Sequence, residues 1–421
     1  MLMQTAIVAL VKIALIVGGI MTAAAYLVLL ERRIAAWVQD RRGPNRVGIP
    51  WSLLIPSWKD WQIFGLLQPA ADGLKMIFKE EYIPAQVDRR LFVLAPIVIL
   101  AAALAIFAVI PMGDQIPAIP ALGLDEPISL TVAPNFDVGL IYVFALSSIA
   151  VYGVILGGWA STSKYSFLGA LRSSAQMIAY ELPLGLGLLG VVLASGTLQL
   201  DEIMTAQASN GVWFAFAQPL GFVVFVVAAF AEAARLPFDL PECEQELVGG
   251  YHTEYAGIKL LLFLVAEFLH MITASFLIVI LFLGGWHLWG ITGDPEQPIT
   301  WVTGLLRMGV LMTIIFMVIL FFLLVRWSWP RFRFDQLMTL AWKIMLPLGL
   351  VNLVTLTILH EAIEAGWLGG LFSGSGGWFW TCVVGWLVAI ASWIVVAWIS
   401  PLVTDNRPQY ETRRFGVDPQ I

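Results

Sequence analysis

Residues 304–325 read GLLRMGVLMTIIFMVILFFLLV, a stretch of 22 residues in which Arg307 is the only charge. The hydrocarbon core of a bilayer is about 30 Å thick, so a helix that rises 1.5 Å per residue needs about 20 apolar residues to cross it. The stretch therefore predicts a membrane-spanning helix. The whole chain suits a membrane, because 59% of its 421 residues are apolar and only 12% are charged, whereas a soluble domain carries about 25% charged residues.

Eight further apolar stretches of similar length lie on both sides of this one. They cover residues 5–30, 91–112, 138–159, 173–193, 213–231, 258–283, 337–359 and 378–400. We therefore predict an all-α integral membrane protein with about nine transmembrane helices.

The basic residues predict how these helices are oriented. The connections 112–137, 195–212, 286–303 and 360–377 contain no Lys or Arg, whereas all basic residues except Lys12 and Arg307 lie in or beside the alternate connections and the tail. Positive charge stays on the cytoplasmic side. We expect the N-terminus outside, the C-terminus inside, and the four outer connections to be plain solvated loops that are acidic where they are charged, as at Asp114 and Asp201.

The first inner connection, residues 31–90, is long and basic. Its segment 69–81 predicts an amphipathic helix on the cytoplasmic side, with Leu74, Ile77 and Phe78 on one side and Asp72, Lys75 and Lys79 on another. Residue types alone leave two interpretations open for this segment: a functional element or a simple anchor at the membrane surface.

Three carboxylates lie within or at the end of predicted spans. Glu181 is inside the fourth span, Glu267 is inside the sixth, and Glu232 ends the fifth. Burying one carboxylate at mid-membrane costs at least about 2.5–3.5 kcal/mol, so such residues usually line a polar path. The alternative is a structural hydrogen bond between helices, or for Glu232 a place at the membrane interface.

The connection 235–254 concentrates acidic residues. Glu242, Glu244 and Glu246 alternate along the sequence, and on a helix Glu242 and Glu246 would be neighbours. Crowded carboxylates have raised pKa values, which would let them exchange protons near neutral pH. The alternative is a solvated acidic loop, but flanking prolines and the following Leu-Val-Gly-Gly favour a packed turn.

Several other chemistries lack a sequence signal. The two cysteines, Cys243 and Cys382, exclude a disulfide framework, and the four histidines contain no i,i+4 pair. There is no Walker motif, dinucleotide fingerprint or hydrolase elbow. The chain thus shows no machinery of its own for nucleotide, hydride or iron–sulfur chemistry and no nucleic-acid partner.

Five motifs in order carry a resemblance to a known family. They are ERRIAAWVQDRRGPNRVG, LLQPAADGLKMIFKE, GWASTSKYSFLGALRSSAQMIAYE, LPFDLPECEQELVGGYHTEYAG and RFRFDQLM. Together they resemble the H subunit of proton-translocating NADH:quinone oxidoreductase, respiratory complex I, over residues 5 to 359. The resemblance implies a membrane subunit that anchors the peripheral arm, forms much of the quinone chamber and opens a carboxylate path toward antiporter-like subunits.

The resemblance also implies roles for individual residues. The quinone-chamber candidates are Arg32, Arg41, Arg46, Asp72, Lys75, Arg172, Arg235, Asp239 and Arg331, although for any single arginine the positive-inside rule is a sufficient explanation. The proton-path candidates are Glu181, Glu232, Glu242, Glu244, Glu246 and Glu267. Ubiquinone or menaquinone is the implied substrate, and flavin, haem and iron–sulfur clusters are expected only on partner subunits. The implied partners are the peripheral quinone-reducing arm, small membrane subunits, antiporter-like subunits and lipid, in a bacterial plasma membrane rather than a mitochondrial inner membrane.

The sequence departs from the family pattern in three places. Residues 49–64 look like an insertion that carries Trp51, Trp58 and Trp61. Phe268 and Phe334 stand where tyrosine is common in the family. Residues 366–421 extend a core of residues 1–365 with a Gly/Ser linker, a Trp-rich ninth span and a basic tail, for which packing against lipid or a neighbouring subunit is the default expectation.

Two other functions remain possible at this point. The membrane anchor of an energy-converting [NiFe] hydrogenase shares the fold, but the long basic first connection favours the quinone enzyme. A stand-alone cation/proton antiporter could also use intramembrane glutamates. It would be expected to show inverted repeats and a mid-span lysine, whereas Lys12 and Lys343 lie toward span ends.

Overall fold

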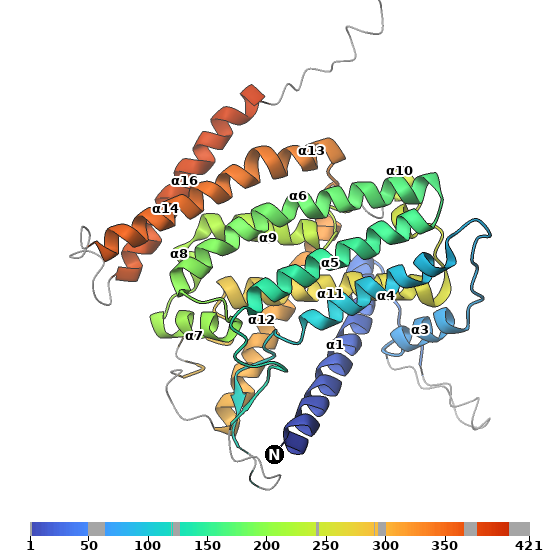
Figure 1. Cartoon of the computed structure of the whole chain (residues 1–421), viewed down its shortest axis with the longest axis horizontal. Coiled ribbons are helices and arrows are strands. Elements are labelled where there is room, and N and C mark those ends of the chain that lie inside the picture. The colour runs from blue at the N-terminus through green and yellow to red at the C-terminus, as the bar shows by residue number, and fades with distance from the viewer. Residues whose placement is uncertain are drawn as a thin grey trace, which may run out of the picture.

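The computed structural model describes residues 2–48, 64–118, 120, 127–240, 244–289, 291–293, 300–365 and 377–403. Residues 49–63 of the insertion predicted at 49–64, the Gly/Ser linker and the basic tail lie outside these residues. The described chain is helical apart from one short hairpin, β1 (Gln115–Ile116) paired antiparallel with β2 (Ile128–Ser129) (Figure 1).

All nine predicted spans are present as helices, which confirms the predicted fold class. Within the described residues, eight helices are long and apolar enough to cross a membrane, and one shorter apolar helix accompanies them. The long ones are α1 (Leu2–Val38), α4 (Arg89–Ile106), α5 (Gly139–Ala160), α6 (Lys164–Ser195), α11 (Gly257–Phe282), α12 (Trp301–Ser328), the run from α13 (Phe334–Thr339) to α14 (Leu346–Glu364), and α16 (Gly377–Val403).

Two spans are not continuous α-helices, and proline explains both. The fifth span is split into α8 (Phe214–Ala217) and α9 (Pro219–Glu232), because Pro219 has no N–H to continue the first helix and suits the first position of the second. The eighth span contains a π-helical segment, η3 (Leu340–Met345), directly before Pro347. Pro347 cannot donate to the carbonyl of Lys343, so the backbone widens there.

The cytoplasmic-side amphipathic helix predicted at 69–81 is α3 (Gln68–Phe78). Pro69 occupies its first turn, where a missing N–H costs nothing. Leu74, Ile77 and Phe78 are exposed on the isolated chain, so they form a face suited to a membrane surface. Asp72 lies on the other side, toward α1.

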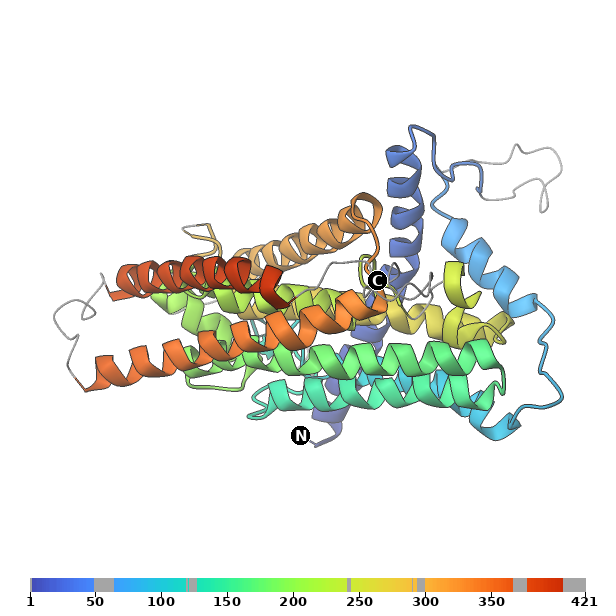
Figure 2. The same ribbon diagram turned by 90° about the horizontal axis from the view of Figure 1, so that it is seen from above.

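α11 is the central helix of the molecule. In its most apolar window 78% of the residues are buried, compared with 6% in α16. α4, α5, α6 and α9 pack against one another beside it. α1 runs steeply across the direction of α5, α6 and α14 in both views, and α3 lies near its C-terminal end (Figures 1 and 2).

The connections predicted to lie outside are not plain solvated loops, so that expectation was wrong for the segments the structure describes. Residues 200–210 form helix α7 (Leu200–Asn210), whose Ile203 and Met204 are buried. The buried Arg307 forms an ion pair with Asp114, and its guanidinium lies 4.3 Å from the ring of Trp286. Sequence reasoning missed these elements because they are short and their polar groups find partners only in the folded chain.

Candidate functional site

A cavity of about 380 Å³ lies between α1, α3 and α11. Its apolar walls come from side chains spaced three or four residues apart, which places them on one face of each helix. On α1 these are Met21, Ala24, Ala25 and Val28, and on α11 they are Leu261, Leu264, Val265 and Phe268. Four predicted site residues also line the cavity: Arg32, Asp72, Arg235 and Glu267.

The charged end of this cavity is organised around Glu31, the last residue before the predicted Arg32. Its carboxylate lies 2.5 Å from Nη1 of Arg326 and 3.6 Å from Nη1 of Arg235. The side chains of Glu31 and Arg235 are only 13% and 6% exposed. A buried carboxylate that neutralises two arginines is costly to remove, because each arginine would then lose this counter-charge.

Asp72 connects α3 to α1. It accepts hydrogen bonds from Arg32 at 2.6 Å and from Gln68 at 3.0 Å. The Arg32 and Asp72 side chains are 50% and 32% exposed, so solvent screens their attraction. This pair therefore positions the amphipathic helix over the cavity more than it stabilises the fold.

The Arg235 guanidinium lies 4.3 Å from the ring centroid of Phe268. At this distance the electron-rich face of the ring attracts the cation. Phe268 thus presents a ring face to the arginine. This contact fixes Arg235 at the cavity wall.

Glu267 lies on α11 at the same cavity and is 9% exposed. The hydroxyl of Tyr251, from the 235–254 connection, donates a hydrogen bond of 2.9 Å to its carboxylate. Gly169 on α6 allows that connection to approach closely, because a Cβ there would lie 2.7 Å from the backbone of Gly250. The connection is therefore packed, as the prolines and glycines in its sequence indicated.

A second, smaller cavity of about 20 Å³ contains the other two intramembrane glutamates. Ser148 donates to Glu181, and Ser147 donates to Glu232. His270 also lines this cavity. The space is about that of one water, which needs roughly 10–15 Å³ and two or more polar partners.

Helix α11 contributes to the lining of both cavities. Glu267 lines the first and His270 lines the second, and residues three apart on a helix share a face. Along the helix axis they are separated by about 4.5 Å. Titratable side chains therefore follow one another from the large cavity to the pair Glu181 and Glu232.

The remaining predicted residues lie outside both cavities. Arg172 and Glu246 form an ion pair of 2.6 Å between α6 and α10 (Glu244–Leu247), and Arg331 donates to the backbone carbonyl of Asp239. These contacts attach the 235–254 connection to α6 and to the connection between α12 and α13. Arg41, Arg46 and Lys75 are exposed. Glu242 lies outside the described residues, and only the backbone of Glu244 is described.

Sequence reasoning missed five polar residues of this site: Glu31, Ser147, Ser148, His270 and Arg326. His270 follows Glu267 by three residues, and this helical spacing could have identified His270 from the sequence. In the part of the chain that the structure describes, no group of three or more His, Cys, Asp or Glu side chains could hold a metal ion.

Comparison with known proteins shows the family of the chain. The NADH dehydrogenase family matches residues 11–357. The first of the H subunits of NADH-quinone oxidoreductase in Geobacter metallireducens is 46% identical over 345 residues, which are 82% of this chain and 94% of that protein. The eighth subunit of the Thermus thermophilus enzyme is 48% identical over 340 residues, 81% of this chain and 83% of that protein. The chain therefore belongs to the NADH dehydrogenase family, as a membrane subunit of the H or 8 type of NADH-quinone oxidoreductase, the counterpart of complex I subunit 1.

Proposed function

We propose that this subunit forms much of the quinone-binding chamber, anchors the peripheral arm and couples quinone reduction to proton translocation. The observation that carries the proposal is the cavity between α1, α3 and α11, whose apolar walls end at Glu31, Arg235 and Glu267. Its volume of about 380 Å³ falls within the roughly 300–1,000 Å³ of small-molecule sites.

The chemistry of the cavity fits a quinone in two ways. A long apolar tail needs a slot at membrane depth, which the apolar faces of α1 and α11 supply. The polar headgroup can accept hydrogen bonds, and Arg235 and Arg32 are donors at the charged end. The substrate is thus a ubiquinone or menaquinone, while flavin and iron–sulfur clusters belong to partner subunits.

Coupling would follow from the position of Glu267. A change in quinone charge near Arg235 alters the field at Glu267, and the titratable groups beyond it can respond by changing their proton occupancy. The next groups are His270, Glu181 and Glu232. The proposal extends this path to the antiporter-like subunits of the complex, and places the complex in a bacterial plasma membrane with the N-terminus of this chain outside.

A steric block of the cavity tests the proposal. Ala25 lines the cavity, whereas Ala23 is exposed on the same helix and does not line it. We expect Ala25→Trp to lower quinone reduction by at least about tenfold, the factor that corresponds to about 1.4 kcal/mol. NADH oxidation with a hydrophilic artificial acceptor should be unchanged, and Ala23→Trp should retain both activities.

Two outcomes would count against the proposal. If Ala25→Trp loses both activities to the same extent, the complex has failed to assemble and the tryptophan has not blocked a quinone site. If it retains full quinone reduction, the cavity is not the chamber. The composition of the purified complex is a separate check: a flavin-containing NADH-oxidising arm is expected, and a nickel-containing subunit would indicate the hydrogenase-type complex.

A further inference from the structure

Helix α3, which forms one wall of the proposed quinone cavity, is attached to two other helices. On α3 itself, Asp72 accepts a hydrogen bond of 2.6 Å from Arg32 of α1. Beyond the end of α3, the carboxylate of Glu81 forms an ion pair of 2.8 Å with Nζ of Lys259, near the start of α11. The cavity-lining Met76 lies between these two attachments along the chain, so both of them determine where this wall stands.

The segment that follows α3 lies against the first residue of α11. Gly257 begins α11 with a φ of +60°, a conformation that favours glycine. A Cβ on Gly257 would lie 3.6 Å from the carbonyl oxygens of Met76 and Lys79, and 3.5 Å from Cγ of Glu81. Residues 76–81 therefore contact the N-terminal end of α11, and α3 lies beside this end of α11 in both views (Figures 1 and 2).

The ion pair joins α11 on the face that is turned away from the cavity. Lys259 shares a helical face with Phe263 and Ala266, which follow it by four and seven residues. These two side chains belong to a buried cluster with Phe92 of α4. The residues of α11 that line the cavity are instead Leu261, Leu264, Val265 and Phe268. Residues 79–81 therefore pass around the end of α11 and are bonded to its opposite face.

Lys259 is a fixed attachment point for this segment. Its Nζ lies 5.8 Å from the ring centroid of Phe92, and that ring is stacked on Tyr255 with centroids 4.0 Å apart. The Lys259 side chain is 11% exposed, so solvent screens its charge weakly. Without the charge of Glu81, water must hydrate the ammonium instead. Water gains that access only when residues 79–81 move away from Lys259.

We propose that Glu81 and Lys259 are positioning residues that set the width of the cavity between α3 and α11, in the apolar slot for the quinone tail. The intact pair holds Met76 in the cavity wall. When the pair is broken, the end of α3, whose Ile77 and Phe78 are exposed, moves away from α11 and the slot widens. The inference rests on the proposed function, because the width affects turnover only if the cavity takes a quinone.

A displaced tail wall changes substrate binding and leaves the headgroup site in place. The pair makes no contact with Arg235 or Glu31, which form their own ion pair at the charged end of the cavity. A substitution that weakens binding equally in the ground state and the transition state raises KM and leaves kcat unchanged. For one partly exposed ion pair we expect the KM for quinone to rise by about fivefold.

Steady-state kinetics of the assembled complex test the proposal, with decylubiquinone as the substrate. We expect Glu81→Gln and Lys259→Met to raise the KM about fivefold with kcat nearly unchanged. Lys259→Arg keeps the cation and should restore the parental KM. Glu80→Gln removes an exposed carboxylate beside Glu81 that does not line the cavity, and as the matched control it should behave like the parent.

A second substrate separates an effect on the tail slot from a general loss of structure. Ubiquinone-1 has the same headgroup as decylubiquinone, but its tail is a single isoprene unit. Its KM should change little in Glu81→Gln and Lys259→Met, because most of the slot is empty when it binds. Equal rises of KM for both quinones, or a lower kcat with an unchanged KM, would overturn the proposal.

Ala25→Trp in the same assay separates failure of this inference from failure of the proposed function. If Ala25→Trp blocks quinone reduction while Glu81→Gln and Lys259→Met keep the parental KM, the positioning role is wrong and the chamber stands. If Ala25→Trp also leaves quinone reduction intact, the proposed function fails and this inference fails with it. Loss of assembly in both Glu81→Gln and Lys259→Met would show that the pair holds the fold, and would likewise overturn the positioning role.

Discussion

Glu31 is the residue on which the charged end of the proposed quinone cavity depends. It is shared by Arg235 and Arg326, and all three side chains are at most 16% exposed. We expect Glu31→Gln to destabilise the subunit by about 3–5 kcal/mol, because it deprives two buried arginines of this counter-charge. The measurement is the temperature at which the purified complex loses this subunit.

Asp72→Asn is the matched comparison for Glu31→Gln. Asp72 also bonds an arginine on α1, but that pair is half-exposed, and exposed pairs contribute only about 0.2–1 kcal/mol. We therefore expect Asp72→Asn to leave the dissociation temperature nearly unchanged. Equal effects of the two substitutions would show that Glu31 does not hold the arginines in place.

Asp201 on helix α7 predicts a pH dependence of stability. Burial, followed by the negative charge of Asp114, raises its pKa to about 6. Between about pH 4 and 6 the folded state binds more protons than the unfolded state, so this group makes stability fall as pH rises through that window. In Asp201→Asn the side chain stays neutral at every pH. We therefore expect the melting temperature of this variant to fall less than that of the parent between pH 4 and 6. At pH 7 its melting temperature should be higher than that of the parent. If the melting temperature of Asp201→Asn differs from that of the parent by the same amount at every pH, Asp201 is not the group that causes the pH dependence.

At the scale of elements, we propose that α11 and the 235–254 connection link the proposed quinone cavity to Glu181 and Glu232. Glu181→Gln keeps the shape of the side chain but removes its titratable group, so we expect slower proton pumping in sealed vesicles with the complex assembled. Glu246→Gln should also lower pumping, because Glu246 attaches α10 to Arg172 on α6. Glu361→Gln, at an exposed carboxylate of α14, is the control. If Glu181→Gln and Glu246→Gln both pump like the parent, these acids are structural.

The sequence predicted the spans because run length and the absence of charge report membrane crossing directly. It did not predict the break at Gln218 or the π-helical segment before Pro347, since a proline can also be accommodated by a kink. It also missed α7, which is too short and polar to cross a membrane.

The sequence likewise predicted some residues of the candidate site and missed others. Glu181, Glu232 and Glu267 stood out because a carboxylate in a span is costly. Ser147 gave no such signal, since it meets Glu232 across 85 residues of sequence. Glu31 was hidden among the basic residues that the positive-inside rule already explains.

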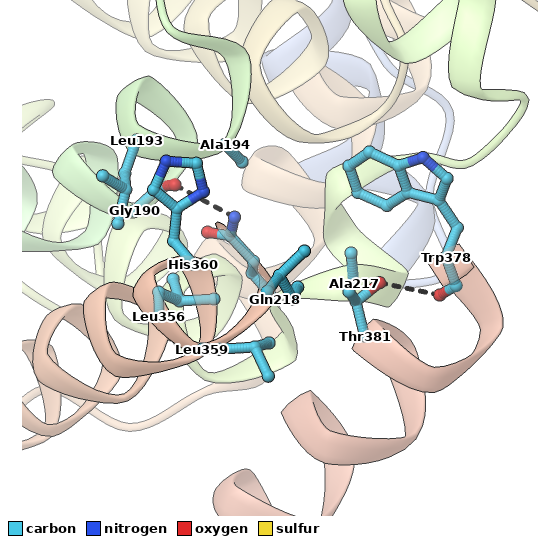
Figure 3. A pocket seen from close by; sticks show the side chains of 11 residues that line it. Gly190, Leu193, Ala194, Ala217, Gln218, Leu356, Leu359, His360, Trp378 and Thr381 are labelled. Atoms are coloured by element: carbon cyan, nitrogen blue, oxygen red, sulfur yellow. Dashed lines mark hydrogen bonds between the residues drawn. The ribbon is translucent and has the colours of Figure 1, made fainter. Parts of the chain in front are cut away.

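At the scale of the whole molecule, three cavities are built on one set of helices. The proposed quinone cavity is built by α1, α3 and α11, and a cavity of about 260 Å³ is built by α6, α14 and α16 (Figure 3). Between them, the small cavity at Glu181 and Glu232 is lined by α4, α5, α6, α9 and α11.

The most direct test of the central claim is to label the assembled complex with a photoreactive quinone and map the modified residues. The account predicts labels on α3 near Gly73 and Met76 and on α11 near Leu261 and Leu264, all of which line the cavity. Excess unlabelled quinone should suppress these labels, and Ala25→Trp should remove them. Labels confined to other helices, or labels on α3 and α11 that unlabelled quinone does not displace, would contradict the claim that this cavity is the quinone chamber.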